Sequence, residues 1–127
     1  MRKPVIFAAL GLLFFPAAAI AQPAKVGKTT AGPVLETHAG MFLYVYDGDK
    51  RGSGNSNCGE SCIKHWRPFL ARADAKPQGD WSIITRASGK KQWAYKGRPL
   101  YTWFKDTKPD QINRNGYDGN RWHAAKP

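Results

Sequence analysis

The chain has 127 residues, a length that suits one small domain rather than several. It carries 20 Lys and Arg against nine Asp and Glu, a formal net charge of +11, so its surface will attract polyanions. Its three His, two Glu and seven Asp form no recognisable local grouping of nucleophile, base and orienting partner, and we therefore expect a protein that is not an enzyme.

The first 21 residues have the pattern of a secretory signal peptide. Arg2 and Lys3 precede an apolar run from Val5 to Ala18, and Ala19-Ile20-Ala21 is a small-x-small cleavage site. A membrane anchor is the alternative, but the run is shorter than the roughly 20 apolar residues that a spanning helix needs. We expect cleavage after Ala21, with no cysteine at the new N-terminus for lipid attachment and no membrane span in the mature chain.

Export determines how the charge is interpreted. Removal of the signal takes away two of the 20 basic residues and leaves 18 against nine acids, a net charge of +9. A periplasmic or secreted protein does not meet nucleic acid in its ordinary work, so we expect no nucleic-acid partner. Anionic components of the cell envelope, or an envelope protein, are the partners that this charge favours.

The mature chain is predicted to begin with a flexible arm over residues 22–32, because this segment has one isolated apolar residue, Val26, and little else to bury. A single β domain is expected over residues 33–127. Its predicted strands are rich in aromatic and β-branched residues and are bounded by turn-forming sequence. They cover Val34–Thr37, Met41–Tyr46, Trp81–Arg86, Lys91–Tyr95, Pro99–Phe104 and Arg121–Ala124, with a hairpin turn at Ala87–Lys90.

One helical turn is predicted between these strands. Asn57 can cap it and Glu60 stands three residues later, so a short turn should run from here toward Trp66. The expected fold is therefore mostly β, a small antiparallel meander or sandwich with one short helical turn.

An internal repeat is the clearest pattern in the sequence. Large and turn-forming residues recur at a constant offset of 57, which indicates two copies of one supersecondary unit, over about residues 34–70 and 91–127. The matched pairs are Gly40 and Gly97, Leu43 and Leu100, Tyr44 and Tyr101, Tyr46 and Trp103, and Asp49 and Asp106, followed by Trp66 and Trp122 at an offset of 56.

The repeated element has the form Tyr-x-aromatic-x-x-Asp, at Tyr44–Asp49 and again at Tyr101–Asp106. With Cys58-x-x-x-Cys62, Trp66-Arg67-Pro68 and the ending Gly119–His123, the chain resembles the secreted bacterial repeat family of predicted lipoproteins with a Tyr-x-(Phe/Trp/Tyr)-x-x-Asp motif. The likeness extends from about Val34 to His123. The resemblance implies an exported, β-rich domain and no particular activity. Many members of the family are lipid-anchored through a cysteine at the cleavage site. This chain has no cysteine there, so we expect no lipid anchor.

The motif residues allow two interpretations. Rings two apart on a strand, such as Tyr44 and Tyr46 or Tyr101 and Trp103, project from one face and could form a stacking platform for a ligand. We favour the other interpretation, that they are core side chains. Asp49 and Asp106 follow the strands, where carboxylates commonly accept hydrogen bonds from turn backbone N–H groups.

Cys58 and Cys62 form the most chemically distinctive pair. Two cysteines in an oxidising compartment, with no third competitor, are expected to form a disulfide. The alternative is a thiol-redox or copper site, in which both thiolates and His65 hold copper(I). We therefore predict a non-enzymatic module that binds a ligand or partner and has no cofactor, with a copper-binding or redox protein as the alternative.

Overall fold

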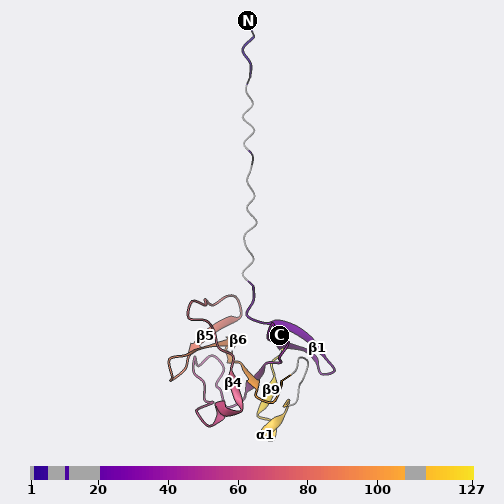
Figure 1. Ribbon diagram of the computed structural model, residues 1–127, viewed down its shortest axis with the longest axis vertical. Helices are drawn as coiled ribbons and strands as arrows, with labels where there is room; N and C mark the ends of the chain where they lie inside the picture. The colour runs from indigo at the N-terminus through magenta and orange to yellow at the C-terminus, as the bar shows by residue number, and fades with distance from the viewer. Residues whose placement is uncertain (1, 6–10, 12–20, 108–113) are drawn as a thin grey trace.

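In the computed structural model, residues 2–5, 11, 21–107 and 114–127 are described, and most of the signal peptide expected over residues 1–21 lies outside them. From Lys25 onward the chain forms short strands with two brief helical turns (Figure 1). The elements in chain order are β1 (Lys25–Thr29), β2 (Gly32–Glu36), β3 (Tyr44–Tyr46), the 3-10 turn η1 (Cys62–Lys64), β4 (Trp66–Pro68), β5 (Trp81–Thr85), β6 (Lys91–Tyr95), β7 (Arg98–Pro99), β8 (Tyr101–Trp103), α1 (Tyr117–Asn120) and β9 (Trp122–Ala124).

A four-stranded antiparallel sheet in the order β4-β8-β3-β9 joins the two repeats. Its central strands are the two motif strands, and Tyr44 pairs with Tyr101 across them. Each repeat then places its last strand beside the motif strand of the other repeat, since Trp66 pairs with Trp103 and Trp122 pairs with Tyr46. Tyr44 and Tyr101 therefore occupy equivalent positions about an approximate twofold axis.

The second sheet is an antiparallel meander, β5-β6-β7. The predicted turn between β5 and β6 is present, and Gly89 adopts the positive φ of 86° that this turn requires. The amide N–H of Arg86 donates to the carbonyl of Lys90 at 2.8 Å and closes the hairpin. The prediction of a small antiparallel β domain with two repeats and a short helical turn is confirmed.

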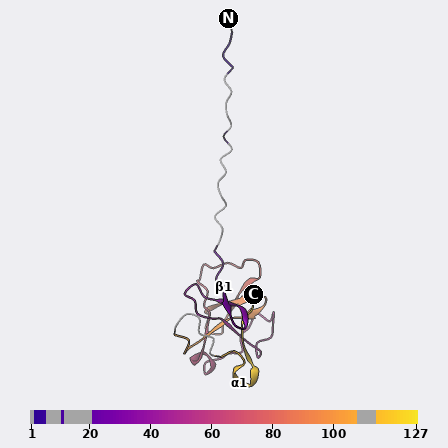
Figure 2. The ribbon, with the colours of Figure 1, turned by 90° about the vertical axis from the view of Figure 1, so that its right-hand side faces the viewer.

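The prediction of a flexible arm over residues 22–32 is wrong for most of this segment. Residues 25–29 form β1, which pairs with β2 over five register positions (Figure 2). The strand is held by its backbone rather than by apolar side chains, since Val26 is 53% exposed. Gly27 is buried against Glu36, so closely that a Cβ at this position would overlap the carboxylate. A segment with few apolar side chains can thus be ordered by its backbone hydrogen bonds.

The helical turn is also displaced from its predicted start. It begins at Cys62, where Ser61 makes no side-chain capping bond. Asn57 instead donates its backbone N–H to Asp49 and its side-chain amide to the carbonyl of Gly48. Asn57 therefore holds the preceding loop and does not cap the helical turn.

Two hydrophobic clusters flank the four-stranded sheet, because successive side chains of a strand point to opposite faces. In β3, Tyr44 belongs to the first cluster and Val45 to the second. The first cluster contains the aromatic side chains of both motifs, and the second lies between this sheet and the meander. The C-terminal segment lies beside the β1–β2 hairpin in both views (Figures 1 and 2), where the amide of Leu35 bonds the carbonyl of Ala125 at 2.8 Å.

Candidate functional site

The two repeats exchange the partners of their motifs. The hydroxyl of Tyr101 donates to Asp49 of the first repeat at 2.5 Å, and the hydroxyl of Tyr44 donates to Asp106 of the second repeat at 2.8 Å. Both phenols are fully buried and both carboxylates are at least 93% buried. The spacing from Tyr to Asp in the motif therefore serves a contact between repeats rather than within one.

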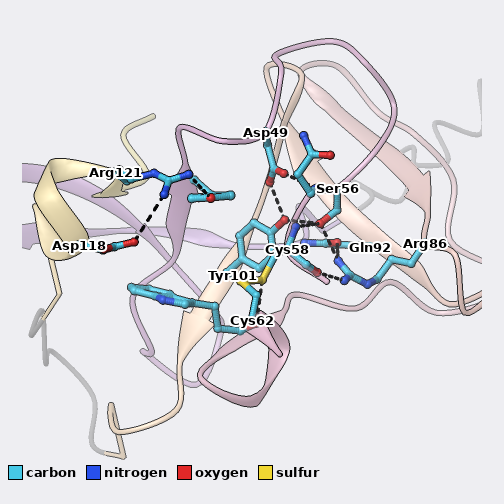
Figure 3. Close-up of a disulfide and its surroundings, with 12 residues drawn as sticks. Asp49, Ser56, Cys58, Cys62, Arg86, Gln92, Tyr101, Asp118 and Arg121 are labelled. Carbon is cyan, nitrogen blue, oxygen red and sulfur yellow. Dashed lines mark hydrogen bonds and ion pairs between the residues drawn. A yellow bond between two sulfur atoms is a disulfide. The ribbon is translucent and has the colours of Figure 1, made fainter. Parts of the chain in front are cut away.

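Asp49 is the centre of a larger polar network beside the disulfide (Figure 3). Its second oxygen accepts the backbone N–H of Asn57 at 2.6 Å, and the Tyr101 hydroxyl also lies 2.6 Å from the Ser56 hydroxyl. Arg86, at the end of β5, donates to Ser56 at 2.9 Å and to Gln92 at 2.7 Å. The network thus links the motif strand, the loop after β3 and the meander.

Burial raises the pKa of the Asp49 carboxyl, although the hydrogen bonds from Tyr101 and from the Asn57 backbone and the charge of Arg86 all oppose the rise. Burial and the bond to Asp49 together raise the pKa of the Tyr101 phenol. The phenol therefore keeps its proton at neutral pH and acts as a fixed donor to the carboxylate.

Cys58 and Cys62 form the predicted disulfide, with Cα atoms 5.1 Å apart, inside the range that this bond requires. Cys58 is fully buried in the first cluster, and its carbonyl accepts a bond from Arg86. The residues between the cysteines are not a regular helix, so the pair escapes the spacing that an α-helix would impose. The bond fixes the turn from which β4 begins.

The copper alternative needs two thiolates, and the disulfide leaves neither sulfur in that form. His65 lies instead against two rings, with centroids 6.1 Å from Trp103 and 4.9 Å from Phe104. Among the described residues, no group of three or more His, Cys, Asp or Glu side chains is placed to hold a metal ion.

Loss of the disulfide should have a modest effect on stability. The closed loop is short, so Cys58→Ser/Cys62→Ser should lower the free energy of unfolding by about 2 kcal/mol by loop-entropy reasoning. Urea denaturation of the oxidised protein and of the variant measures this difference. Thiol counting on unfolded, unreduced protein should find no free thiol, and two free thiols would contradict the pairing.

The motif rings lie in the core and not on an open platform. Tyr44 and Tyr101 are fully buried and Trp103 is 4% exposed, whereas Tyr46 is half-buried. Trp66 and Trp122, one from each repeat, stack face to face at 3.8 Å with planes 3° apart. Tyr46 continues the stack on Trp122 at 4.4 Å. The rings hold the two repeats together.

A cationic pocket of about 270 Å³ was not predicted from the sequence. Its lining combines the apolar side chains of Val45, Ala124 and Ala125 with a set of basic side chains. The basic residues come from three separate stretches of the chain and are Arg51, Lys96, Arg98, His123 and Lys126. We call this the cationic pocket.

Contacts at its edge hold the cationic pocket in shape. The Arg51 side chain donates to the carbonyl of Lys96 at 2.7 Å, which ties the loop after β3 to the turn before β7. The ring of His123 lies 2.8 Å from the carboxylate of Asp47. Gly97 has φ of 80°, and a Cβ here would come within 2.9 Å of the Gly52 backbone, so the two turns meet closely.

Comparison with protein families gives two matches, to residues 25–69 and 82–126, and both are to a family described as a secreted repeat of unknown function. Together they cover well over half of the chain. The chain belongs to this secreted-repeat family. The two matches are offset by the same 57 residues as the motif pairs, which confirms the duplication and extends each repeat to include β1 or β5.

Membership of the secreted-repeat family places the protein outside the cytoplasm, in the periplasm or the medium. No curated protein and no solved structure matches the chain. Among the described residues, no helix is long and apolar enough to cross a membrane.

Proposed function

We propose that this secreted-repeat protein is a non-enzymatic module that binds an anionic component of the cell envelope in the cationic pocket. The observation that carries the proposal is that five basic side chains and several apolar ones line the same pocket. Charged groups around an apolar cavity orient a ligand, while the apolar walls supply the buried area.

The distribution of charge between the repeats supports a specific site. Four of the five basic residues that line the cationic pocket come from the second repeat, and three of these have uncharged counterparts in the first repeat. Lys96 corresponds to Ala39 and Arg98 to Met41 at the offset of 57, and Lys126 corresponds to Leu70 at the offset of 56 that relates Trp122 to Trp66. General solubility would be served equally well by either half.

The chemistry of the cationic pocket favours phosphate or carboxylate groups carried on a larger molecule. Arg51 and Arg98 offer planar guanidinium groups that can bind such anions through two hydrogen bonds. His123 contributes least, because its ring is already partnered by the carboxylate of Asp47. The net charge of +9 on the mature chain would draw a polyanion toward this face.

The polar network around Asp49 supports a binding role over a catalytic one. Ser56, Tyr101 and Arg86 are residue types that occur in catalytic sites, but here they form hydrogen bonds with one another and with the backbone. The raised pKa of Tyr101 makes the phenol a poor proton donor to a substrate. These groups fix the loop that carries Arg51 to the cationic pocket.

Charge reversal tests the proposal with sodium tripolyphosphate as the probe. Arg98→Glu/Lys126→Glu should weaken binding measured by calorimetry at least about ten-fold, because two charge-assisted contacts are lost. The matched control is Lys28→Glu/Lys90→Glu, which changes net charge equally at exposed sites away from the cationic pocket. The control should stay within about two-fold of the parent at 0.15 M salt. Equal losses in both variants would contradict a specific site.

A further inference from the structure

A second pocket, of about 220 Å³, lies beside Trp66, at the end of the aromatic stack that is away from Tyr46. Its walls are rings, among them Trp66, Trp103 and Tyr117, and its charged groups are all basic. Those groups are Lys105 and Arg114, and His65 also lines the pocket. Among the described residues that line it there is no carboxylate. We call this the aromatic pocket.

Arg114 is held in the aromatic pocket by ring faces. Its guanidinium carbon lies 4.6 Å from the centroid of Trp103 and 4.4 Å from that of Tyr117, so the group lies against both rings. Its Nε is buried and has no hydrogen-bond partner, and no carboxylate among the described residues pairs with it. The guanidinium is therefore fixed in position by the rings, and no described carboxylate compensates its charge.

A second arginine lies against the corresponding motif ring of the other repeat, and its surroundings are different. There Arg121 lies 5.1 Å from the ring of Tyr46, the residue that corresponds to Trp103. Its guanidinium donates to the Tyr46 hydroxyl and lies 3.9 Å from the carboxylate of Asp118 (Figure 3). Arg121 is thus satisfied within the protein, whereas Arg114 has no carboxylate partner in the part of the chain that the structure describes.

The shape of the walls selects the ligand. Trp103 is tilted by 49° from Trp66 and by 47° from Tyr117, so the rings form a wedge and not a parallel slot. A flat aromatic molecule stacks best between parallel faces. A sugar ring is thicker and presents C–H groups on both sides, so it can contact the two rings of the pocket that are open to solvent, Phe104 and Tyr117.

From these observations we infer that the aromatic pocket binds an acidic sugar, with the sugar ring against Phe104 and Tyr117 and its carboxylate at Arg114. The uncharged part of the sugar is recognised by the rings, and the carboxylate supplies the missing partner of the guanidinium. Because Arg114 is already fixed by two rings, little side-chain freedom is lost on binding. The inference is independent of the cationic pocket.

Titration with digalacturonate, followed by tryptophan fluorescence, tests this inference. Arg114→Gln should weaken binding about ten-fold through loss of a charge-assisted contact, and Arg121→Gln, which removes the same charge at the equivalent place, should stay within about two-fold. Tyr117→Ala removes a ring that is 41% exposed and should also weaken binding. Thermal melts of each variant show that it is folded. Neutral maltose should bind more weakly than digalacturonate.

Three results would overturn the inference. Digalacturonate could fail to bind the parent protein, or Arg114→Gln and Arg121→Gln could lose affinity equally. Arg98→Glu/Lys126→Glu should bind digalacturonate as the parent does, and loss of binding in this variant alone would place the sugar in the cationic pocket instead.

Discussion

Replacing Trp122 with alanine should give the largest loss of stability of any single change considered. The side chain is 2% exposed and packs face to face on Trp66 at 3.8 Å, so its removal leaves a cavity at the axis between the repeats. Truncation of a buried Trp costs about 3–5 kcal/mol, a large part of the total for a domain of this size. Urea denaturation with fluorescence detection measures it.

A double-mutant cycle makes the test specific to the stack. Trp66→Ala should cost about as much as Trp122→Ala, and the double variant should cost less than the sum by about 1–3 kcal/mol, because both single changes remove the same stacking contact. Leu70→Ala, at a side chain that is 47% exposed, is the control and should change stability by less than about 0.5 kcal/mol. Full additivity in the cycle would show that the two rings do not couple.

The Tyr101→Phe variant should lose about 2–3 kcal/mol although it removes one oxygen atom. Asp49 is 7% exposed and accepts the Tyr101 hydroxyl at 2.5 Å, so the change leaves a buried carboxylate short of a donor. The control is Tyr46→Phe, because the Tyr46 hydroxyl bonds an exposed Arg121 side chain. We expect a change below about 1 kcal/mol in the control. Equal losses would contradict a special role for the buried pair.

The cost of Tyr101→Phe should also depend on pH. Burial raises the folded-state pKa of Asp49 above its ordinary 3.8, and loss of the Tyr101 hydrogen bond, which opposes that rise, should raise it further. The folded variant then holds its proton more tightly than the unfolded chain, so its stability falls as the pH rises above 3.8. The difference from the parent should therefore be larger at neutral pH than in acid. A difference that does not change with pH would mean that Asp49 is not the affected group.

The duplication could be predicted from the sequence because large residues recur at a constant offset. The exchange of partners between repeats could not. A Tyr and an Asp five residues apart suggest a local contact, and nothing along the chain indicates that Tyr101 reaches Asp49 while Tyr44 reaches Asp106. That pairing depends on the antiparallel register at the centre of the sheet, which is a property of the folded domain.

The strand β1 and the cationic pocket show two other limits. The segment 25–29 is ordered by backbone pairing, and hydrophobic content gives no signal for it. Arg51, Arg98 and Lys126 are far apart in sequence and become neighbours through the turn at Gly97 and the end of β9. The disulfide was predictable because compartment chemistry and cysteine count decide it, with little dependence on the tertiary fold.

The most direct test of the proposed binding function is an amide chemical-shift map of the mature, oxidised protein titrated with sodium tripolyphosphate. The proposal predicts that the largest shifts cluster at Arg51, Lys96, Arg98 and Lys126, and that they saturate together. Shifts spread evenly over the basic surface, or concentrated away from these residues, would contradict a binding site in the cationic pocket.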